Sequence, residues 1–250
     1  MKTTHICEII SKNEISNGIF DVIVKFPEIS QPGQFIHILC GDGVLLRRPI
    51  SICDCGKGWL RFIFAVRGEG TNLLSHKKEG DMLDILGPLG MGFDVSKKGN
   101  GTAILIGGGI GIYPLINLAK ALGNDAEAIL GFRTKDLIVL EDEFNKICNE
   151  THIATDDGGY GFHGLVTDVL LEQIKAKNVT SIYACGPMPM MKAIKKIALE
   201  NNIHCQLSLE ERMGCGIGAC AVCVCKSKGE YSKVCQNGPV YNAKEVDFDD

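Results

Sequence analysis

Residues 102–114 read TAILIGGGIGIYP, and this stretch decides the fold of the larger part of the chain. Thr102 to Ile106 are apolar enough for a buried strand, and four glycines follow within the five positions of Gly107–Gly111. Pro114 then suits the first turn of a helix. A strand, a glycine turn and a helix in this order begin a parallel α/β unit, and the turn offers free amides to a pyrophosphate.

A second candidate segment, Cys185-Gly186-Pro187, follows a later strand and is expected at the same edge of the sheet. Ligands of open α/β sheets bind at the carboxyl ends of the strands. The glycine turn does not match G-x-G-x-x-G, because Ile112 stands in place of the last glycine, and a plain packing turn is the alternative. The combination predicts a nucleotide site, with Gly108, Gly109, Gly111, Cys185, Gly186 and Pro187 as its candidate residues.

Strand-like runs alternate with helical stretches over residues 98–209, which indicates a parallel sheet. The predicted strands are 102–106, 126–132, 151–154, 181–185 and 204–209, and the predicted helices are 113–122, 141–149, 165–177 and 188–201. Within this region, Asp156-Asp157-Gly158-Gly159 either orients a ribose or makes an Asx turn. Arg133 is the one candidate for contact with a ribose phosphate.

Residues 1–97 have a different texture, with short alternating strands predicted at 5–10, 19–26, 34–39, 59–66 and 82–86. Glycine and proline separate these strands, which is typical of an antiparallel barrel or sandwich. The fold class is therefore multidomain, with an antiparallel β domain followed by a parallel-sheet α/β domain.

Two short motifs in this first region carry possible chemistry. Arg48-Pro49-Ile50-Ser51 lies between two predicted strands, and its guanidinium and hydroxyl suit a flavin pyrophosphate and the flavin ring. An Arg-Pro surface turn is the plainer alternative. Gly70-Thr71 enters a predicted short helix whose amides suit a phosphate, although a tight turn capped by Thr71 is equally consistent.

The most specific signal is the cysteine spacing after Glu210, where Cys215-x4-Cys220-x2-Cys223 is followed by Cys235. This is the spacing at which four thiolates hold a plant-type 2Fe-2S cluster. The glycines at 214, 216 and 218 let the backbone curl so that amides point at the sulfurs. A four-cysteine zinc site is the alternative. Cys225 is left out of the ligand set.

Composition narrows the class of protein. The 250 residues are 45% hydrophobic and 22% charged, with a net charge of -4, which excludes a disordered chain and argues against nucleic acid as a partner. No signal peptide or membrane span is evident. We therefore expect a cytoplasmic protein without a membrane partner, whose twelve cysteines are reduced or bind metal.

Three strings, together with their order, carry a family resemblance: LRRPISI at 46–52, ERMGCGIGAC at 211–220 and CQNGPVY at 235–241. They resemble the ferredoxin reductase superfamily and, within it, the electron-transfer subunits of class B dihydroorotate dehydrogenases. The resemblance implies an FAD-binding barrel at 1–97, an NAD-binding domain at 98–209 and a 2Fe-2S domain at 210–250. It implies FAD contacts at Arg48, Pro49, Ile50, Ser51, Ile63, Phe64, Ala65, Gly70 and Thr71, with Cys215, Cys220, Cys223 and Cys235 as iron ligands.

The same resemblance implies a partner subunit that contains FMN and oxidises dihydroorotate, in a heterotetramer with two copies of each subunit. Electrons would then pass through the cluster and FAD to NAD+, because a flavin exchanges electrons singly or in pairs. No general base is evident, so no catalytic residue is assigned. The alternatives are a related subunit of a hydrogenase, sulfite reductase or ferredoxin:NADP+ reductase complex, or a zinc- and nucleotide-binding regulator without catalysis.

Overall fold

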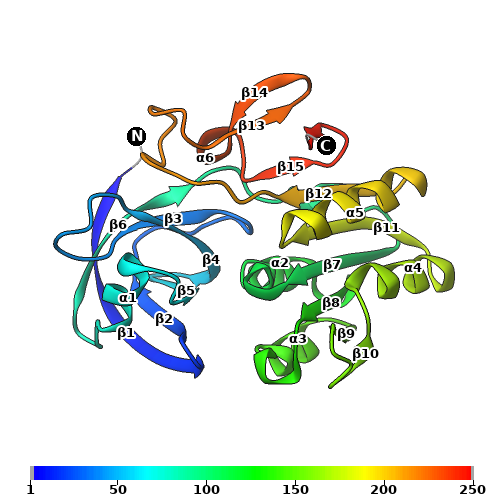
Figure 1. Ribbon diagram of the computed structural model, residues 1–250, viewed down its shortest axis with the longest axis horizontal. Coiled ribbons are helices and arrows are strands. Elements are labelled where there is room, and N and C mark those ends of the chain that lie inside the picture. Colours follow the sequence, from blue (N-terminus) through cyan, green and yellow to red (C-terminus); the bar gives the residue numbers. More distant parts are fainter. Residues whose placement is uncertain (1–2, 249–250) are drawn as a thin grey trace.

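The computed structural model describes residues 3–248. The end residues of the expected first and last domains, 1–2 and 249–250, lie outside the described residues. Six antiparallel strands close into a barrel in the order β1-β2-β5-β4-β3-β6 (Figure 1). Their bounds are β1 Thr4–Ser16, β2 Ile19–Lys25, β3 Phe35–Leu39, β4 Arg48–Gly56, β5 Trp59–Ala65 and β6 Met82–Leu89, with helix α1 (Glu69–Ser75) between β5 and β6.

Strand β4 is the element of the barrel that the sequence did not predict. The expectation that Arg48–Ser51 lies between two strands is wrong, because these residues are the first four of β4. Pro49 is tolerated at the start of the strand, where it lies opposite His37 of β3. The strand continues with Ile50 and Ile52, which are buried in the barrel core.

The second half is a seven-stranded sheet in the order β10-β9-β8-β7-β11-β12-β15. All its pairings are parallel except that of β15 with β12. The strands are β7 Thr102–Gly108, β8 Ala126–Phe132, β9 Glu150–Thr155, β10 Phe162–His163, β11 Val179–Cys185, β12 His204–Ser208 and β15 Val240–Asn242. The helices are α2 Leu115–Leu122, α3 Glu141–Ile147, α4 Val166–Ala176 and α5 Met188–Glu200, with short 3-10 turns η1 Val95–Lys97, η2 Gly109–Ile112, η3 Gly123–Asp125 and η4 Lys135–Leu137.

Both faces of this sheet are covered by helices, which explains why its central strands read as continuous apolar runs. In β7, Ile104 and Ile106 pack with α4 and α5, whereas Ala103 and Leu105 pack with α2 and α3. The alternation follows the period of two residues of a strand. The predicted barrel and parallel-sheet domain are confirmed.

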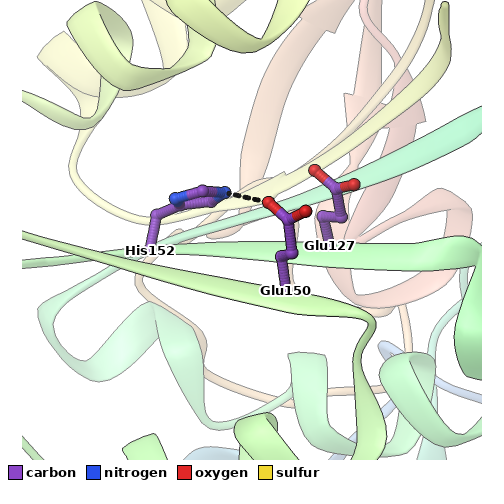
Figure 2. A group of neighbouring side chains, drawn as sticks. All are labelled: Glu127, Glu150 and His152. Atoms are coloured by element: carbon purple, nitrogen blue, oxygen red, sulfur yellow. Dashed lines mark ion pairs between the residues drawn. The ribbon is translucent and has the colours of Figure 1, made fainter. Parts of the chain in front are cut away.

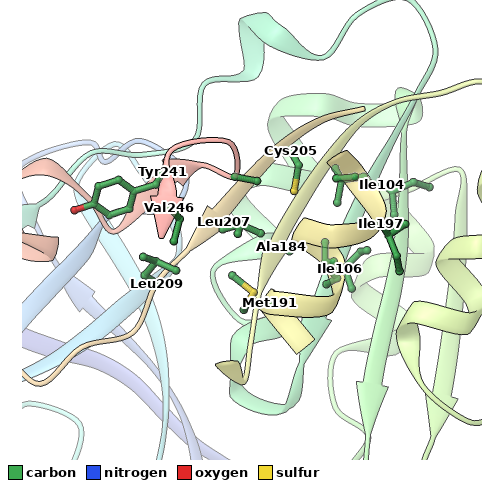
Figure 3. Packing of buried hydrophobic residues seen from close by; sticks show 14 of the residues in the cluster. Ile104, Ile106, Ala184, Met191, Ile197, Cys205, Leu207, Leu209, Tyr241 and Val246 are labelled. Carbon is green, nitrogen blue, oxygen red and sulfur yellow. The ribbon is translucent and has the colours of Figure 1, made fainter. Parts of the chain in front are cut away.

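The C-terminal segment is more ordered than the tail expected from the sequence. It forms β13 (Val224–Ser227), β14 (Glu230–Lys233), helix α6 (Val234–Asn237) and β16 (Val246–Asp247), in addition to β15. Strands β14, β13 and β16 make a small antiparallel sheet. Figure 3 shows Tyr241 and Val246 of this segment beside Leu207 and Leu209, in the same core as Ile104 and Met191. The segment therefore shares its core with the large sheet.

Barrel and sheet are joined by ion pairs as well as by apolar packing. Arg61 of β5 binds the carboxylate of Asp21 in the barrel through Nε and Nη2, and its Nη1 lies 2.8 Å from Oε1 of Glu143 in α3. A second pair joins Lys120 of α2 to Asp54 of β4. Within residues 3–248, no helix is both long and apolar enough to span a bilayer.

We expect Arg61→Met to lower the free energy of unfolding by about 2 kcal/mol, because it leaves two half-buried carboxylates without their partner. The change is measured as a lower midpoint of urea unfolding. Lys25→Met is the matched control, since the Lys25–Glu8 pair is exposed and should contribute less than about 0.5 kcal/mol. Equal losses in the two variants would contradict a structural role for the Arg61 contacts.

Candidate functional site

A cavity of about 260 Å³ lies between the barrel and the C-terminal segment. It collects most of the residues expected to contact a flavin: Pro49, Ile50 and Ser51 from β4, Ile63, Phe64 and Ala65 from β5, and Thr71 from α1. Met213 and Pro239 from the C-terminal segment also line it. We call this space the barrel cavity.

Arg48 and Gly70 directly precede lining residues but do not themselves line the barrel cavity. They lie against each other, because a Cβ on Gly70 would stand 2.8 Å from Nε of Arg48. The guanidinium donates to the carbonyl of Leu46. A glycine at 70 therefore leaves the Arg48 side chain room beside α1.

A larger cavity of about 850 Å³ opens at the carboxyl ends of β7, β8 and β11. Gly108, Gly109, Gly186 and Pro187 line this sheet cavity as expected. Gly111 does not, because it packs on the backbone of β11, where a Cβ would stand 2.3 Å from the carbonyl oxygen of Cys185. Cys185 lines the barrel cavity instead.

The two cavities meet, since Ala65, Arg67, Ile110, Tyr113 and Glu210 line both of them. Sequence reasoning did not name Arg67, Ile110 or Tyr113 as site residues. Ile110 and Tyr113 belong to the glycine turn and its cap, whereas Arg67 follows β5 and reaches the same wall only in the folded chain. Glu210 belongs to the shared wall as well. Desolvation in that wall raises the pKa of Glu210, and the nearby Arg67 guanidinium opposes the rise. Burial likewise raises the pKa of Tyr113 to about 12.

The four predicted ligand cysteines come together in two pairs. The thiols of Cys215 and Cys220 are hydrogen-bonded, and so are those of Cys223 and Cys235, the last of which is supplied by α6. Across residues 3–248, no three of these sulfurs lie all within 4.8 Å of one another. A single tetrahedral zinc ion would hold its four sulfurs at roughly 3.8 Å from one another, given Zn–S bonds near 2.3 Å. Two pairs of thiolates fit a two-iron cluster better.

Backbone amides surround these sulfurs. Cys215 Sγ accepts the N–H groups of Ile217, Ala219 and Cys220 at 3.5, 3.2 and 3.4 Å. Cys220 Sγ accepts the N–H of Cys215 at 3.4 Å. Cys235 Sγ accepts the N–H of Gly218 at 3.2 Å, and Cys223 Sγ accepts the N–H of Cys235 at 3.4 Å. Positive φ angles of 71° at Gly216 and 84° at Gly218 allow this curl. Although burial raises the pKa of the Cys215 thiol, the amide bonds from Ile217, Cys220 and Ala219 outweigh it and lower that pKa to about 6. These amides favour a thiolate at Cys215, whereas burial and the neighbouring Cys223 thiol raise the pKa of Cys235 to about 11.

Cys225 has a different environment, consistent with its exclusion from the ligand set. It lies on β13, and its thiol hydrogen-bonds to Tyr241. Burial raises the pKa of this thiol, so it favours the neutral form.

A separate polar group, Glu127, Glu150 and His152 on β8 and β9, has the proximity of metal ligands (Figure 2). However, the ammonium of Lys177 already lies 2.7 Å from Glu127 and 2.9 Å from Glu150. Glu127 lines a third cavity, which is polar and has a volume of about 520 Å³. This cavity lies at the amino ends of the strands, away from the sheet cavity. We interpret the group as an ion-pair network that joins the strands to the end of α4.

Two family models match the chain. Residues 210–247 match the iron-sulfur cluster binding domain of dihydroorotate dehydrogenase B, and residues 105–196 match the oxidoreductase NAD-binding domain. The former range contains all four paired cysteines, and the latter contains the glycine turn and Cys185-Gly186-Pro187.

Curated relatives extend the match to nearly the whole chain. The "Dihydroorotate dehydrogenase B (NAD(+)), electron transfer subunit" of Geobacillus thermodenitrificans (strain NG80-2) is 44% identical over 252 residues, which cover 95% of this chain and 96% of the relative. The chain belongs to this family of electron-transfer subunits. Another member, from Bacillus caldolyticus, is 46% identical over 230 residues, 88% of each chain.

Solved structures show that the fold is shared with other proteins. The structure of an NADH-dependent reduced ferredoxin-NADP oxidoreductase superposes with a TM-score of 0.88 at 34% identity. The match covers 99% of this chain and 91% of that chain. A ferredoxin NADP+ reductase from Neisseria gonorrhoeae has a TM-score of 0.68 at 16% identity, covering 80% of this chain and 92% of that chain. The second likeness concerns the fold alone, and it supports the barrel and sheet.

We expect Gly70→Ala to weaken FAD retention by about tenfold, because the new methyl group displaces Arg48, and one charged hydrogen bond contributes at least about 1.4 kcal/mol. Gly68→Ala is the control, since a Cβ there meets no atom within 4 Å. Retention is measured from the fluorescence of FAD released on dilution. If both variants held FAD as the parent chain does, Arg48 would not be a flavin contact.

Proposed function

We propose that the chain passes electrons from an FMN-containing catalytic partner subunit, through a 2Fe-2S cluster and FAD, to NAD+ in the dihydroorotate dehydrogenase reaction of pyrimidine synthesis. The observation that carries this proposal is the position of the barrel cavity. It shares a wall with the sheet cavity through residues such as Tyr113 and Glu210, and it is also lined by Met213, two residues before Cys215. One flavin site therefore adjoins both a nucleotide site and the cysteine loop.

Each part of the chain has a distinct task in this proposal. When bound, the cluster supplies one-electron exchange, the flavin exchange of one or two electrons, and the nicotinamide a hydride. Cys215, Cys220, Cys223 and Cys235 hold the irons, and the loop amides compensate the negative charge of the sulfurs. Residues Ile63, Phe64 and Ala65 of β5 line the barrel cavity and would contact the flavin, while the Phe64 side chain packs in the barrel core. No residue is assigned to dihydroorotate oxidation, which belongs to the partner.

The surface around the cysteine loop supports docking of the partner there. Cys220 is exposed, and Ile217 and Val222 beside it are 49% and 55% exposed. The loop from 214 to 223 carries no charged residue, as expected for the desolvated centre of an interface. We extend the proposal to a cytoplasmic heterotetramer with two copies of each subunit. This part of the proposal is inferred from the family resemblance alone.

The sheet cavity favours NAD over NADP. Arg133 and Asp156 both line it at the ends of β8 and β9. Asp157 is occupied within its own turn, where its Oδ1 accepts the N–H of Gly159 at 2.9 Å. Asp156 is thus the carboxylate that remains for a ribose 2′-hydroxyl, and its charge would repel a 2′-phosphate.

We expect Asp156→Asn to lower kcat/KM for NADH by roughly 10-fold and to raise the ratio of NADPH to NADH use, because a charged hydrogen bond is worth about 1.5–3 kcal/mol. NADH oxidation with an artificial electron acceptor measures this without the partner. Asp157→Asn, which alters only the turn, should leave the ratio near that of the parent chain. An unchanged ratio in Asp156→Asn would remove this residue from the nucleotide site.

We expect Cys215→Ser to lose the visible absorption and iron of the cluster while FAD absorption remains. Cys225→Ser is the matched control and should retain both chromophores, since its thiol is bonded to Tyr241. Iron analysis and absorption spectra measure the outcome. A colourless parent chain that contained zinc would instead support the regulatory alternative.

The function itself is tested by purifying the native complex and assaying dihydroorotate-dependent NAD+ reduction. We expect an FMN-containing subunit to co-elute and NADH to appear only when both subunits are present. NADH formation that required ferredoxin instead of dihydroorotate would support the alternative favoured by the ferredoxin-NADP oxidoreductase likeness. Cys215→Ser within the complex should abolish NADH formation but leave the partner able to reduce a dye with dihydroorotate.

A further inference from the structure

His37 of β3 is a buried imidazole between the barrel cavity and the cysteine loop. Its neighbours Ile36 and Ile38 point into the barrel core, so the alternation of the strand turns Phe35 and His37 outward toward the C-terminal segment. Phe35 and Pro49, the residue opposite His37, both line the barrel cavity. The histidine thus lies directly behind the wall of the proposed flavin site.

The other side of the imidazole contacts the turn that follows Cys215. A Cβ on Gly216 would stand 2.7 Å from Nδ1 of His37 and 3.2 Å from its Cε1. Only a glycine lets the loop approach the ring this closely. The ring therefore fills the space between the flavin wall and the loop of the ligand cysteines.

The polypeptide leaves this imidazole without a hydrogen-bond partner. The side chain is 0% exposed, and within residues 3–248 neither Nδ1 nor Nε2 has a partner. Burial, followed by the charges of Arg47 and Arg48, lowers its pKa to about 4, so the ring is neutral and carries one N–H. A buried polar group without a partner costs about 1–3 kcal/mol, and an apolar residue would fill the space without that cost.

We propose that His37 donates a hydrogen bond to a sulfur of the bound 2Fe-2S cluster, and that this bond raises the reduction potential of the cluster. The inference rests on the proposed function, which places the cluster in the adjoining loop. A donor to sulfur stabilises the reduced cluster, which is the more negative form. His37 would thereby make it easier for the cluster to accept an electron. The histidine acts from the side of the cluster that faces the flavin.

The test is a redox titration of the intact complex, followed by the electron paramagnetic resonance signal of the reduced cluster. His37→Leu removes the donor, and we expect the ratio of reduced to oxidised cluster at a fixed ambient potential to fall at least about threefold, which corresponds to a shift of roughly 30 mV at 59 mV per tenfold. His37→Gln keeps an N–H donor and should recover part of the shift. Should His37→Leu fail to fold, His37→Met replaces it, because methionine adapts to irregular spaces.

Leu89→Met is the control for packing. A Cβ on Gly216 would stand 3.2 Å from Cδ1 of Leu89, and neither leucine nor methionine offers a hydrogen-bond donor. A cluster potential unchanged in His37→Leu, an equal shift in Leu89→Met, or a shift confined to the flavin would each overturn the inference. Absence of the cluster signal from the parent complex would instead overturn the proposed function. The two failures are therefore distinguishable.

Discussion

The ionic contact of Arg61 with Asp21 and Glu143 is the constraint on which the site depends, because both cavities are assembled from the barrel and the sheet together. Electron and hydride transfer require fixed distances between bound groups, so two halves that moved freely would lose the site. The guanidinium is suited to this task because its planar donors bind two carboxylates at once. Phe35 and Leu89 of the barrel add apolar contacts to the core of the sheet.

Charge is distributed differently in the two parts of the electron path. Around the cysteines, backbone N–H groups point at the sulfurs in the contacts described above, and one basic side chain, Lys233, donates to the carbonyl of Gly218 in the same loop. Around the cavities, charge is compensated by side chains, of which Arg67 and Glu210 share one wall. Backbone dipoles are fixed by the fold and need little rearrangement when charge arrives, whereas the cavity side chains can adjust to different bound molecules.

Much of this arrangement could be predicted from sequence, and the exceptions have physical causes. Five strands of the sheet, β7, β8, β9, β11 and β12, were located within a few residues by their apolar runs and by the glycine turn at 107–111. The short edge strands β10 and β15 were not predicted. Strand β4 was not predicted because Arg48-Pro49 has the composition of a turn. Arg67 and Tyr113 were not predicted to line the cavities, because tertiary packing alone brings them together. The two aspartates at 156 and 157 are equivalent in sequence, and only the structure distinguishes them: Asp156 lines the sheet cavity, whereas Asp157 accepts the N–H of Gly159.

The pairing of β15 with β12 has a consequence for how such a chain can evolve. The chain leaves the sheet after Ser208 and returns at Val240, which is the residue paired with Ser208. Everything between these two positions, including all four paired cysteines, begins and ends at one point of the framework. The segment is topologically an insertion, so it can be lengthened, replaced or deleted without changing the order of the other strands. A redox module attached in this way can be matched to a new electron donor while the nucleotide-binding half is inherited unchanged.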